Sequence, residues 1–534
     1  MDDIEARADL KVDFASLDRY HDCHLRRCSV ASNKLETLER WWSRIQDESR
    51  RNSVEMKANN DRLGMRYFSD EQVEKIHTNA VGLLETHGFM VEHRGTLELL
   101  KDNGAQVDFD KQVVKVKPDL MEKCMRSTIC RFVLAARDSS KDVVVETNMQ
   151  LPVFRNGGGV DKMLDAETGE FREMFLSDIT RLYRALDALD FINVVSPLYA
   201  HDIPEKVRDL VVLETLFQNT SKHVNIRTFS KANLETIVRM GTIVAGGLEN
   251  LRRRPVFSLF DSPLSPLKFP ELTVDVFITA GKYGIPLYMA NLPIAGATGP
   301  FTLAGMVQLL HAELLASVVI CQTANPGAPM LLHPLAMTMD WKAGTGLSAS
   351  IESTMITAAS IQVTNDIFNM PVDVHGPWSD THIADSQSAI ERTFQTLLPA
   401  LCGAASIAGF GDIQEGMAFC PVQLGIDEEL AGFTLKALEG IPADDDRLCV
   451  DAIKRVGFGG NFMTDETTIK YLRTDYYEPR ILNRLSREEW VKAGSKDINA
   501  RAKERISKLM KEHEPEPLEA GIKKELRALV KNME

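Results

Sequence analysis

The segment formed by residues 371–386 holds the densest group of chemically useful side chains in the sequence. Residues 372–374 are typical of a short strand that ends at Gly376, and a helix is expected to begin near Ser386. In barrel enzymes, a loop between the end of a strand and the start of a helix is where the catalytic groups lie. A Gly-Pro turn with solvated polar residues would have the same composition, so both interpretations stay open on spacing alone. The side chains in this loop are His375, Trp378, Ser379, Asp380 and His382.

The overall composition is that of an ordinary globular protein of 534 residues, with 44% hydrophobic and 26% charged residues. Its net charge of −14 argues against nucleic acid and against an anionic membrane as partners. The acidic N-terminus lacks the apolar core of a signal peptide. Eight scattered cysteines without a Cys-x-x-Cys pair are typical of a reduced compartment, so we expect a cytoplasmic protein.

Two segments could be mistaken for a membrane span and for a zinc site. Residues 303–320 are the longest apolar stretch, but they carry Gln308, His311 and Glu313, which favours a buried helix over a membrane span. His21, Cys23, His24 and Cys28 cluster near the N-terminus, yet their spacing fits no standard zinc site. We therefore expect no bound metal.

From residue 151 to residue 440 the chain alternates between short strand-like runs and helical segments. Eight such pairs predict a (β/α)₈ TIM barrel, because few other architectures contain eight alternations. The predicted strands are residues 151–154, 193–197, 223–226, 256–259, 286–289, 330–332, 372–374 and 405–408.

The barrel is expected to be one of four regions. Residues 1–64 form a charge-rich extension to which we assign no function, although residues 35–45 could form an isolated helix. Residues 65–150 predict a small α+β lobe, which precedes the catalytic barrel of residues 151–440. Residues 441–534 predict a helical extension, whose last part, 492–534, either wraps the barrel or forms an oligomer contact.

The loop after the seventh predicted strand resembles a motif of the trimethylamine:corrinoid methyltransferases. The family pattern runs Gly-Ser-pyrrolysine-Ser-Asp-Ala-Lys-Val-Pro-Asp-x-Gln, and residues 376–387 read Gly-Pro-Trp-Ser-Asp-Thr-His-Ile-Ala-Asp-Ser-Gln. Trp378 therefore stands where the founding members carry pyrrolysine. The chain is similar to the non-pyrrolysine branch, whose described activities include demethylation of glycine betaine and related quaternary amines.

The resemblance extends from about residue 65 to residue 530. Two departures concern the substrate more than the fold: the family's Ser-Pro-Glu motif appears as Ser350-Ile-Glu352, and the Lys of Asp-Ala-Lys is His382. Further matching motifs lie at residues 262–267, 296–305, 326–328, 456–462 and 490–497.

The resemblance implies transfer of a methyl group from nitrogen to the Co(I) of a corrinoid that a partner protein carries. A quaternary ammonium already has a neutral amine as its leaving group, so it needs desolvation and alignment but no covalent activation. We therefore expect glycine betaine or a related quaternary amine as the substrate. We further expect a corrinoid protein as the partner, no tightly bound cofactor, and a homo-oligomer.

Three other functions stay open. A tertiary amine such as trimethylamine could be the substrate, or the chain could be an inactive homologue that only binds a corrinoid protein. A barrel aldolase or lyase would need a Schiff-base lysine within a strand, and none of the predicted strands contains one.

A permanent cation without N–H donors is best held by aromatic faces, each of which contributes roughly 0.5–2 kcal/mol when desolvated. Trp378 is the first candidate for such a wall, and Trp341, after the sixth predicted strand, is the second. Either ring could instead only pack against or cover the barrel.

The carboxylate of a betaine would need hydrogen-bond donors, and acidic groups would balance the ammonium charge. His375 is the favoured donor, Arg227 after the third strand is an alternative, and His333 at the end of the sixth is a weaker third. Glu352 and Asp380 are the candidate catalytic carboxylates. Each of these residues also has a structural alternative. His375 could bond to a backbone carbonyl, and Arg227 could form a surface salt bridge. Glu352 could cap a helix, and Asp380 could cap a loop.

Overall fold

The computed structural model describes residues 63–533, and the chain divides into two units, Met1–Arg62 and Leu63–Glu534. The predicted helix at residues 35–45 and the cluster from His21 to Cys28 lie outside the described residues.

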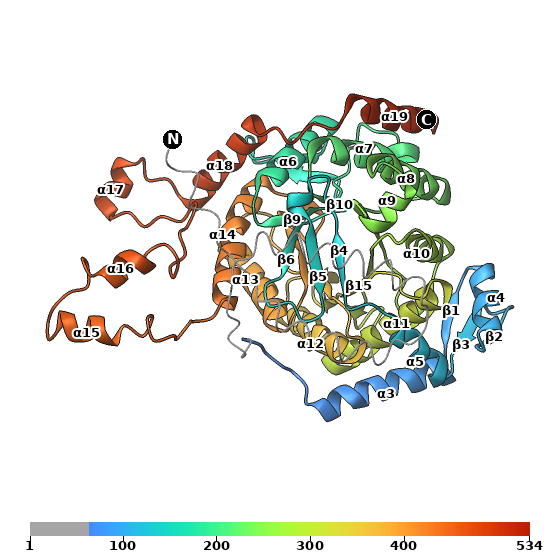
Figure 1. The fold of residues 1–534 in the computed structure, drawn as a ribbon. Coiled ribbons are helices and arrows are strands. Elements are labelled where there is room, and N and C mark those ends of the chain that lie inside the picture. Colours follow the sequence, from blue (N-terminus) through green and yellow to red (C-terminus); the bar gives the residue numbers. More distant parts are fainter. Residues whose placement is uncertain (1–62, 534) are drawn as a thin grey trace. The chain divides into compact units, whose positions relative to one another are not determined.

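Eight parallel strands form a closed barrel at the centre of the second unit (Figure 1). Their order around the barrel is β15-β13-β11-β10-β9-β6-β19-β18, and a parallel bridge between Leu332 and Val372 closes the ring. The predicted TIM barrel is confirmed, and each predicted strand overlaps an observed one. The strands are β6 (Val153–Asn156), β9 (Ile192–Val195), β10 (His223–Ile226), β11 (Phe257–Asp261), β13 (Leu287–Asn291), β15 (Met330–Pro334), β18 (Asp373–His375) and β19 (Ser406–Phe410).

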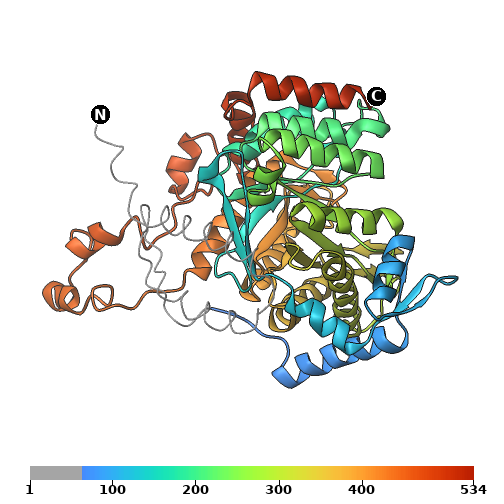
Figure 2. The same ribbon diagram turned by 45° about the vertical axis from the view of Figure 1, so that its right-hand side comes forward.

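Helices follow the strands and surround the barrel, as Figure 2 shows. Several begin at a capping side chain that accepts a hydrogen bond from the first-turn backbone, which satisfies an otherwise unpaired N–H. Ser230, Thr302, Ser350 and Asp385 cap four of them in this way. The helices are α6 (Leu176–Ala188), η4 (Glu205–Val207), α7 (Arg208–Asn219), α8 (Lys231–Val244), α9 (Leu248–Arg253), α10 (Glu271–Tyr283), α11 (Leu303–Ala324), α12 (Ile351–Phe368), α13 (Ser386–Leu401) and α14 (Pro421–Leu438).

The long apolar helix α11 is a core helix, as predicted. By length and composition it could cross a membrane, but 78% of its apolar window is buried inside the fold, where it packs against α12 and against helices of the N-terminal lobe. The polar residues within it have partners: Glu313 accepts a hydrogen bond from Asn291 at the end of β13, and His311 contacts His77.

The N-terminal lobe closes one end of the barrel. Its β4–β5 hairpin lies against the N-terminal ends of the barrel strands, where Leu134 and Val143 pack with Val153 and Val194. The other end, at which the strands terminate, is the end left for a site. The elements of the lobe are α3 (Asp70–Thr86), β1 (Phe89–Val91), α4 (Arg94–Asp102), β2 (Gln106–Asp108), β3 (Val113–Lys115), α5 (Pro118–Arg126), β4 (Arg131–Leu134), η3 (Ser139–Lys141) and β5 (Val143–Glu146).

Short strands decorate the loops that follow the barrel strands. They are β7 (Lys162–Leu164), β8 (Phe171–Glu173), β12 (Lys268–Phe269), β14 (Ile294–Ala295), β16 (Met337–Asp340), β17 (Thr345–Leu347), β20 (Asp412–Ile413) and β21 (Ala418–Phe419). Of these, β12 pairs with β1 and thereby joins the lobe to the barrel.

The end of the chain wraps the barrel. Helix α18 packs against α14 and α6, and α19 packs against α7 and α8. This arrangement supports the first of the two roles expected for residues 492–534. The C-terminal helices are α15 (Val450–Val456), α16 (Glu466–Tyr471), α17 (Arg487–Lys492), α18 (Ile498–Glu512) and α19 (Ala520–Lys531).

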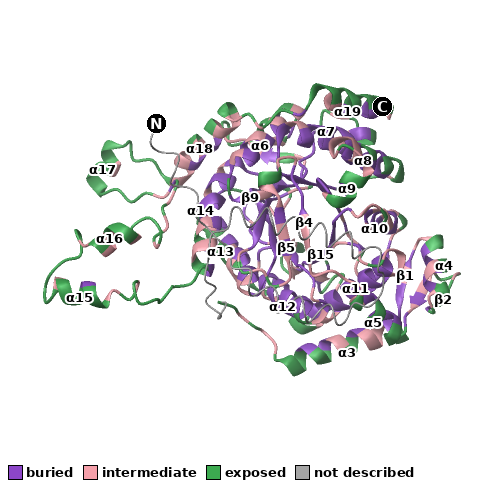
Figure 3. Cartoon of the chain, in the orientation of Figure 1, coloured by how far each residue is buried: buried purple, intermediate pink, exposed green. Residues whose placement is uncertain are grey.

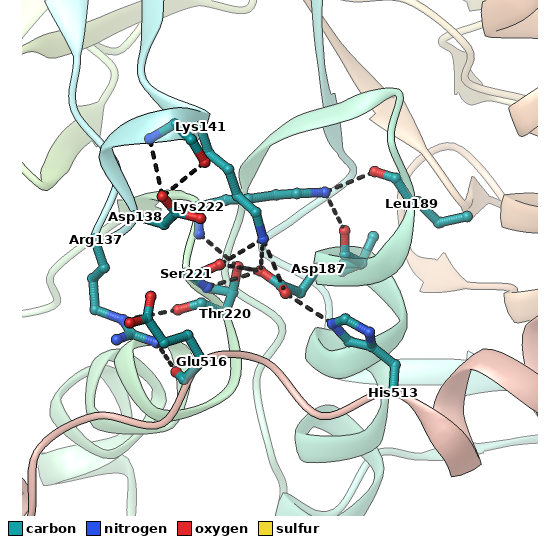
Figure 4. Close-up of polar contacts among 12 residues, drawn as sticks. Arg137, Asp138, Lys141, Asp187, Leu189, Thr220, Ser221, Lys222, His513 and Glu516 are labelled. Carbon is teal, nitrogen blue, oxygen red and sulfur yellow. Dashed lines mark hydrogen bonds and ion pairs between the residues drawn. The ribbon is translucent and has the colours of Figure 1, made fainter. Parts of the chain in front are cut away.

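Asp187, in the last turn of α6, anchors this tail (Figure 4). Its buried carboxylate accepts hydrogen bonds from His513 Nε2 at 2.9 Å, from Thr220 Oγ1 at 2.9 Å and from the Ser221 backbone at 2.8 Å. The Lys141 ammonium lies 3.3 Å away. Burial by itself raises the pKa of Asp187, but these donors and the lysine charge outweigh it and hold the pKa well below its usual value.

We predict that Asp187→Asn loosens the tail, because the charge that His513 and Lys141 face is removed, at a cost of about 1–3 kcal/mol. Since the folded-state pKa is lowered, this stabilisation is complete above the unfolded pKa of about 4 and is lost as the pH falls through the folded value. The variant should therefore have a lower Tm at pH 7 and faster hydrogen exchange in α18. Asp190→Asn, at a carboxylate that is 88% exposed, is the control. Equal Tm values for the two variants would contradict the anchoring role.

Candidate active site

A buried ion pair crosses the interior of the barrel. Arg155, on β6, donates to both carboxylate oxygens of Asp373, on β18, at 2.6 and 3.2 Å. The two side chains are 2% and 0% exposed. Arg155 also donates to Ser196 Oγ at 3.1 Å and lies over the ring of Tyr288, 5.0 Å from its centroid. Burial raises the pKa of Asp373, but the Arg155 charge and His333 outweigh it and hold the pKa well below the usual range, so Asp373 is a carboxylate.

Two histidines continue this pair toward the ends of the strands. His333 Nδ1, on β15, lies 2.5 Å from Asp373 Oδ2, and His333 Nε2 lies 3.1 Å from His375 Nδ1. Because Asp373 is ionised, it accepts from the N–H at His333 Nδ1. Burial lowers the pKa of both histidines, and for His375 the nearby His333 and Arg155 lower it further, so both rings are neutral at pH 7.

These protonation states fix the tautomers of the chain. A neutral His333 whose Nδ1 carries the proton has an unprotonated Nε2, which accepts from the N–H at His375 Nδ1. His375 then carries a lone pair at Nε2, and no hydrogen bond within residues 63–533 engages that nitrogen. The sequence Arg155–Asp373–His333–His375, here called the relay, therefore presents an acceptor, not a donor, at its end.

Trp378 packs against the end of the relay. Its ring lies 4.5 Å from the His375 ring, centroid to centroid, and the two planes are tilted by 42°. The indole N–H donates to Asp412 Oδ2, on β20, at 3.2 Å. Only 8% of Trp378 is exposed.

Asp412 is a buried carboxyl with one unsatisfied oxygen. Its Oδ1 has no hydrogen-bond partner among the described residues, and burial raises its pKa to about 8 against the lowering effects of Arg392 and Trp378. Asp412 is therefore mostly protonated at pH 7. Gly157 makes room for it, because a Cβ at that position would lie 1.8 Å from the Asp412 carboxyl carbon.

A second buried ion pair holds the loops that carry Trp378 and Asp412. Arg392, on α13, donates to both oxygens of Asp427, on α14, and also to the backbone carbonyls of Gly409 and Asp412. The loop carbonyl of Trp378 accepts from Gln395 Nε2 at 3.0 Å. These contacts fix the loop that follows β18 to the end of β19.

The two predicted carboxylates occupy other positions. Asp380 accepts from Ser348 N at 3.0 Å, from Ser348 Oγ at 2.7 Å and from Ala349 N at 3.1 Å, so it ties its loop to the residues before α12. Glu352 is exposed in the first turn of α12. Neither has a contact with the relay among the interactions of the described residues.

Trp341 and Arg227 also lie apart from the relay. Trp341, between β16 and β17, is 65% exposed and lies 6.0 Å from the ring of Phe301. The Arg227 side chain, after β10, is 47% exposed and lies 3.7 Å from the Asp261 carboxylate. No hydrogen bond, ion pair or ring contact in the described part of the chain joins either residue to His375. The structure thus brings together three of the predicted site residues: His333, His375 and Trp378.

Sequence reasoning missed Arg155 and Asp412. Arg155 directly follows the apolar residues Val153 and Phe154 in β6, and Asp412 follows Gly411 just after β19. A charge within a barrel strand is unusual because it must be paired when buried, and that signal could have identified Arg155.

Comparison with known proteins decides the family. Residues 42–534 match the family model described as trimethylamine methyltransferase (MTTB). The chain belongs to this family. The predicted resemblance is thereby confirmed.

Two curated relatives carry informative names. The chain is 35% identical over 473 residues to trimethylamine methyltransferase MttB of Desulfitobacterium hafniense, covering 88% of this chain and 95% of the relative. It is 27% identical over 466 residues to the glycine betaine methyltransferase of Desulfitobacterium hafniense strain Y51, covering 87% and 96%. A crystal structure of Methanosarcina barkeri monomethylamine methyltransferase matches with a TM-score of 0.49 and 11% identity, over 98% of this chain and 96% of that one.

We predict that Asp373→Asn destabilises the fold by about 3–5 kcal/mol, because it leaves the Arg155 guanidinium buried without a counter-charge. The double variant Arg155→Met/Asp373→Leu should recover much of that loss, since both charges are then replaced by apolar side chains. Thermal unfolding of the two variants measures this coupling. A wild-type Tm in Asp373→Asn would show that the pair is not needed for folding.

Proposed function

We propose that the chain is a corrinoid-dependent methyltransferase that moves a methyl group from glycine betaine or a related quaternary amine to the Co(I) of a corrinoid protein. The observation that carries this proposal is Trp378, an aromatic ring in the motif position of pyrrolysine, packed on a neutral histidine at the end of the barrel strands. Family membership and a relative named glycine betaine methyltransferase support it.

The groups around Trp378 suit a trimethylammonium group. An indole ring attracts a desolvated cation through its face, and the His375 Nε2 lone pair adds negative potential without offering a hydrogen. The ionised Asp412 carboxylate would be the counter-charge of the bound ammonium group. A cation nearby favours the ionised carboxyl, so Asp412 would lose its proton as the substrate binds, and its bond to the indole N–H would strengthen.

The reaction needs no proton from these residues. The electron pair of Co(I) forms the bond to the methyl carbon, and the electron pair of the broken C–N bond leaves with the neutral tertiary amine. Neutral histidines fit this balance, and the proton of Asp412 is not transferred to the substrate, because the tertiary amine leaves as a neutral molecule. The contribution of the chain is then to desolvate the ammonium and to align the methyl group with the incoming cobalt.

The contacts of the other candidate residues change the roles that we propose for them. Both ring nitrogens of His333 are used in the relay, and His375 presents an acceptor, which repels a carboxylate. Arg227, half-exposed after β10, is therefore the proposed donor to the carboxylate of a betaine. Asp412 takes the counter-charge role for which Glu352 and Asp380 were candidates, since Asp380 is held by backbone donors.

A tertiary amine is the second candidate substrate, favoured by the 35% identity to a trimethylamine methyltransferase. We predict methylation of cob(I)alamin, or of a Co(I) corrinoid protein, with glycine betaine or a close analogue, and none with trimethylamine, because none of the groups near Trp378 in residues 63–533 can convert a tertiary amine into a quaternary adduct. The absorbance change of the corrinoid measures the reaction. Methylation driven by trimethylamine would refute this assignment.

We predict that Trp378→Ala raises the Kd of the quaternary amine roughly 5- to 30-fold, from the 1–2 kcal/mol of a desolvated cation–π contact. Trp378→Phe should lose less, because a weaker ring remains. Calorimetric titration measures both, with Trp490→Ala in α17 as the control for loss of an indole elsewhere. Unchanged affinity in a folded Trp378→Ala protein would make Trp378 a packing residue.

A further inference from the structure

The turn between β20 and β21, residues 414–417, covers the indole of Trp378. A Cβ atom on Gly416 would lie 3.1 Å from Trp378 Cε2 and 3.2 Å from Cζ2, so the backbone of the turn lies directly against the ring. The His375 ring also packs on this indole, and only 8% of Trp378 is exposed. The described residues therefore leave no face of the indole free for a trimethylammonium group.

The base of this hairpin is firmly held. Ile413 and Phe419, one on each of its two strands, are 0% exposed, and Arg392 donates to the backbone carbonyl of Asp412. The preceding strand β19 is buried along its whole length, as are most of the barrel strands in Figure 3. A movement that uncovers the indole is therefore confined to the turn itself.

The turn, in contrast, is held by few contacts. Gln414 N donates to Thr381 O at 3.0 Å, and Glu415 N donates to Ser379 O at 2.9 Å. No side chain of the turn makes a hydrogen bond or ion pair with another residue in the described part of the chain. Met417 is 63% exposed. A segment with so few contacts opens locally at a small cost in free energy.

The backbone of the turn is also strained. Gln414, Glu415 and Gly416 follow one another with φ values of 53°, 57° and 75°, all in the left-handed region. Glycine adopts this region freely, but residues with a Cβ rarely do, and strained segments of this kind are concentrated at ligand clamps and switches. Opening the turn lets Gln414 and Glu415 relax, which lowers the cost of opening further.

We propose that residues 414–417 are a lid that a quaternary ammonium displaces from Trp378, and that Gly416 sets how easily the lid opens. Asp412 lies at the foot of this lid, and its buried Oδ1 has no hydrogen-bond partner among the described residues. A cation that takes the place of Gly416 would lie beside both the indole and this carboxyl group. The inference rests on the proposed function, because its ligand is the one proposed for the Trp378 site.

The lid links two quantities that can be measured separately. If only the open form binds the ligand, the apparent Kd is the intrinsic Kd divided by the fraction of open protein. The same opening releases the amides of Gln414 and Glu415 from their acceptors, so it also sets their rate of hydrogen exchange. As long as the lid is mostly closed, a substitution that favours opening must speed exchange and lower the Kd by the same factor.

The test is Gly416→Ala in the full-length protein, with tetramethylammonium and glycine betaine as probes. Alanine is disfavoured at a φ of 75° and its Cβ meets the indole, so the closed lid is destabilised. Amide exchange of residues 414 and 415, measured by mass spectrometry, should become roughly 3- to 10-fold faster, and the calorimetric Kd of both probes should fall by the same factor. In the wild-type protein, saturating tetramethylammonium should also speed this exchange.

Gly169→Ala is the matched control. Gly169 has a φ of 74° in the turn between β7 and β8 of the same sheet, and a Cβ there meets no atom of the described residues within 4 Å. This variant should leave the Kd and the exchange of residues 414 and 415 unchanged. Gln414→Asn is the opposite change, because asparagine tolerates the left-handed region better than glutamine, and it should slow exchange and weaken binding. It keeps the test decisive if Gly416→Ala does not fold.

Three results would overturn the lid. The first is exchange at residues 414 and 415 that is as slow as in β19 and does not respond to tetramethylammonium. The second is unchanged or weaker binding in a folded Gly416→Ala protein, and the third is equal effects in Gly169→Ala. Quaternary amine binding with unaltered exchange would refute the lid alone and leave the proposed function in place. Absence of binding in both the wild type and Gly416→Ala would refute the proposed function, and the lid with it.

Discussion

The candidate site depends on the ion pair between Arg155 and Asp373 inside the barrel. Two charges that are 2% and 0% exposed are tolerated only because each satisfies the other and the remaining donors and acceptors have partners. The pair joins β6 to β18, strands that lie on either side of β19. It therefore fixes the geometry of the barrel end and, through Asp373, the proton position on His333.

The protonation states of the site residues follow from the ion pair between Arg155 and Asp373. The positive charge of Arg155 neutralises that of Asp373, so Asp373 does not stabilise a protonated histidine beside it. Burial therefore keeps His333 and His375 neutral. Among the described residues that contact Trp378, Asp412 is the group that can change charge near neutral pH, because burial raises its pKa to about 8. A site of this kind is neutral when it is empty and can acquire one negative charge beside an indole ring. That combination suits the proposed ligand, which carries a permanent positive charge.

The sequence predicted much of this arrangement because the relevant information is local. All eight barrel strands overlap the predicted runs, since short strand-like segments alternate with well-capped helices. His375 and Trp378 were predicted together because they lie in one loop. The third predicted residue, His333, could be placed at the end of a strand, but not as a link in a relay.

The parts that could not be predicted depend on contacts between distant residues. Arg155 and Asp373 are separated by 218 positions, and only the barrel closure directs both side chains to the interior. Asp380 was expected to be available for catalysis, yet the fold brings the backbone of Ser348 and Ala349 to its carboxylate. The exposure of the apolar residues in segment 440–476 could not be predicted for a related reason: their spacing is ordinary, and only the path of the chain shows that they have no core to enter.

We propose that a quaternary ammonium binds beside Trp378 and that the ionised Asp412 carboxylate is its counter-charge. The most direct test is the number of protons released on binding, obtained by titrating glycine betaine at pH 7 in buffers of different ionisation enthalpy. Since the pKa of Asp412 is about 8 and a cation lowers it, binding should release a proton at pH 7 and release progressively less as the pH rises above 8. In Asp412→Asn the release should vanish. Binding whose enthalpy is the same in every buffer, in the wild-type protein at pH 7, would contradict the account.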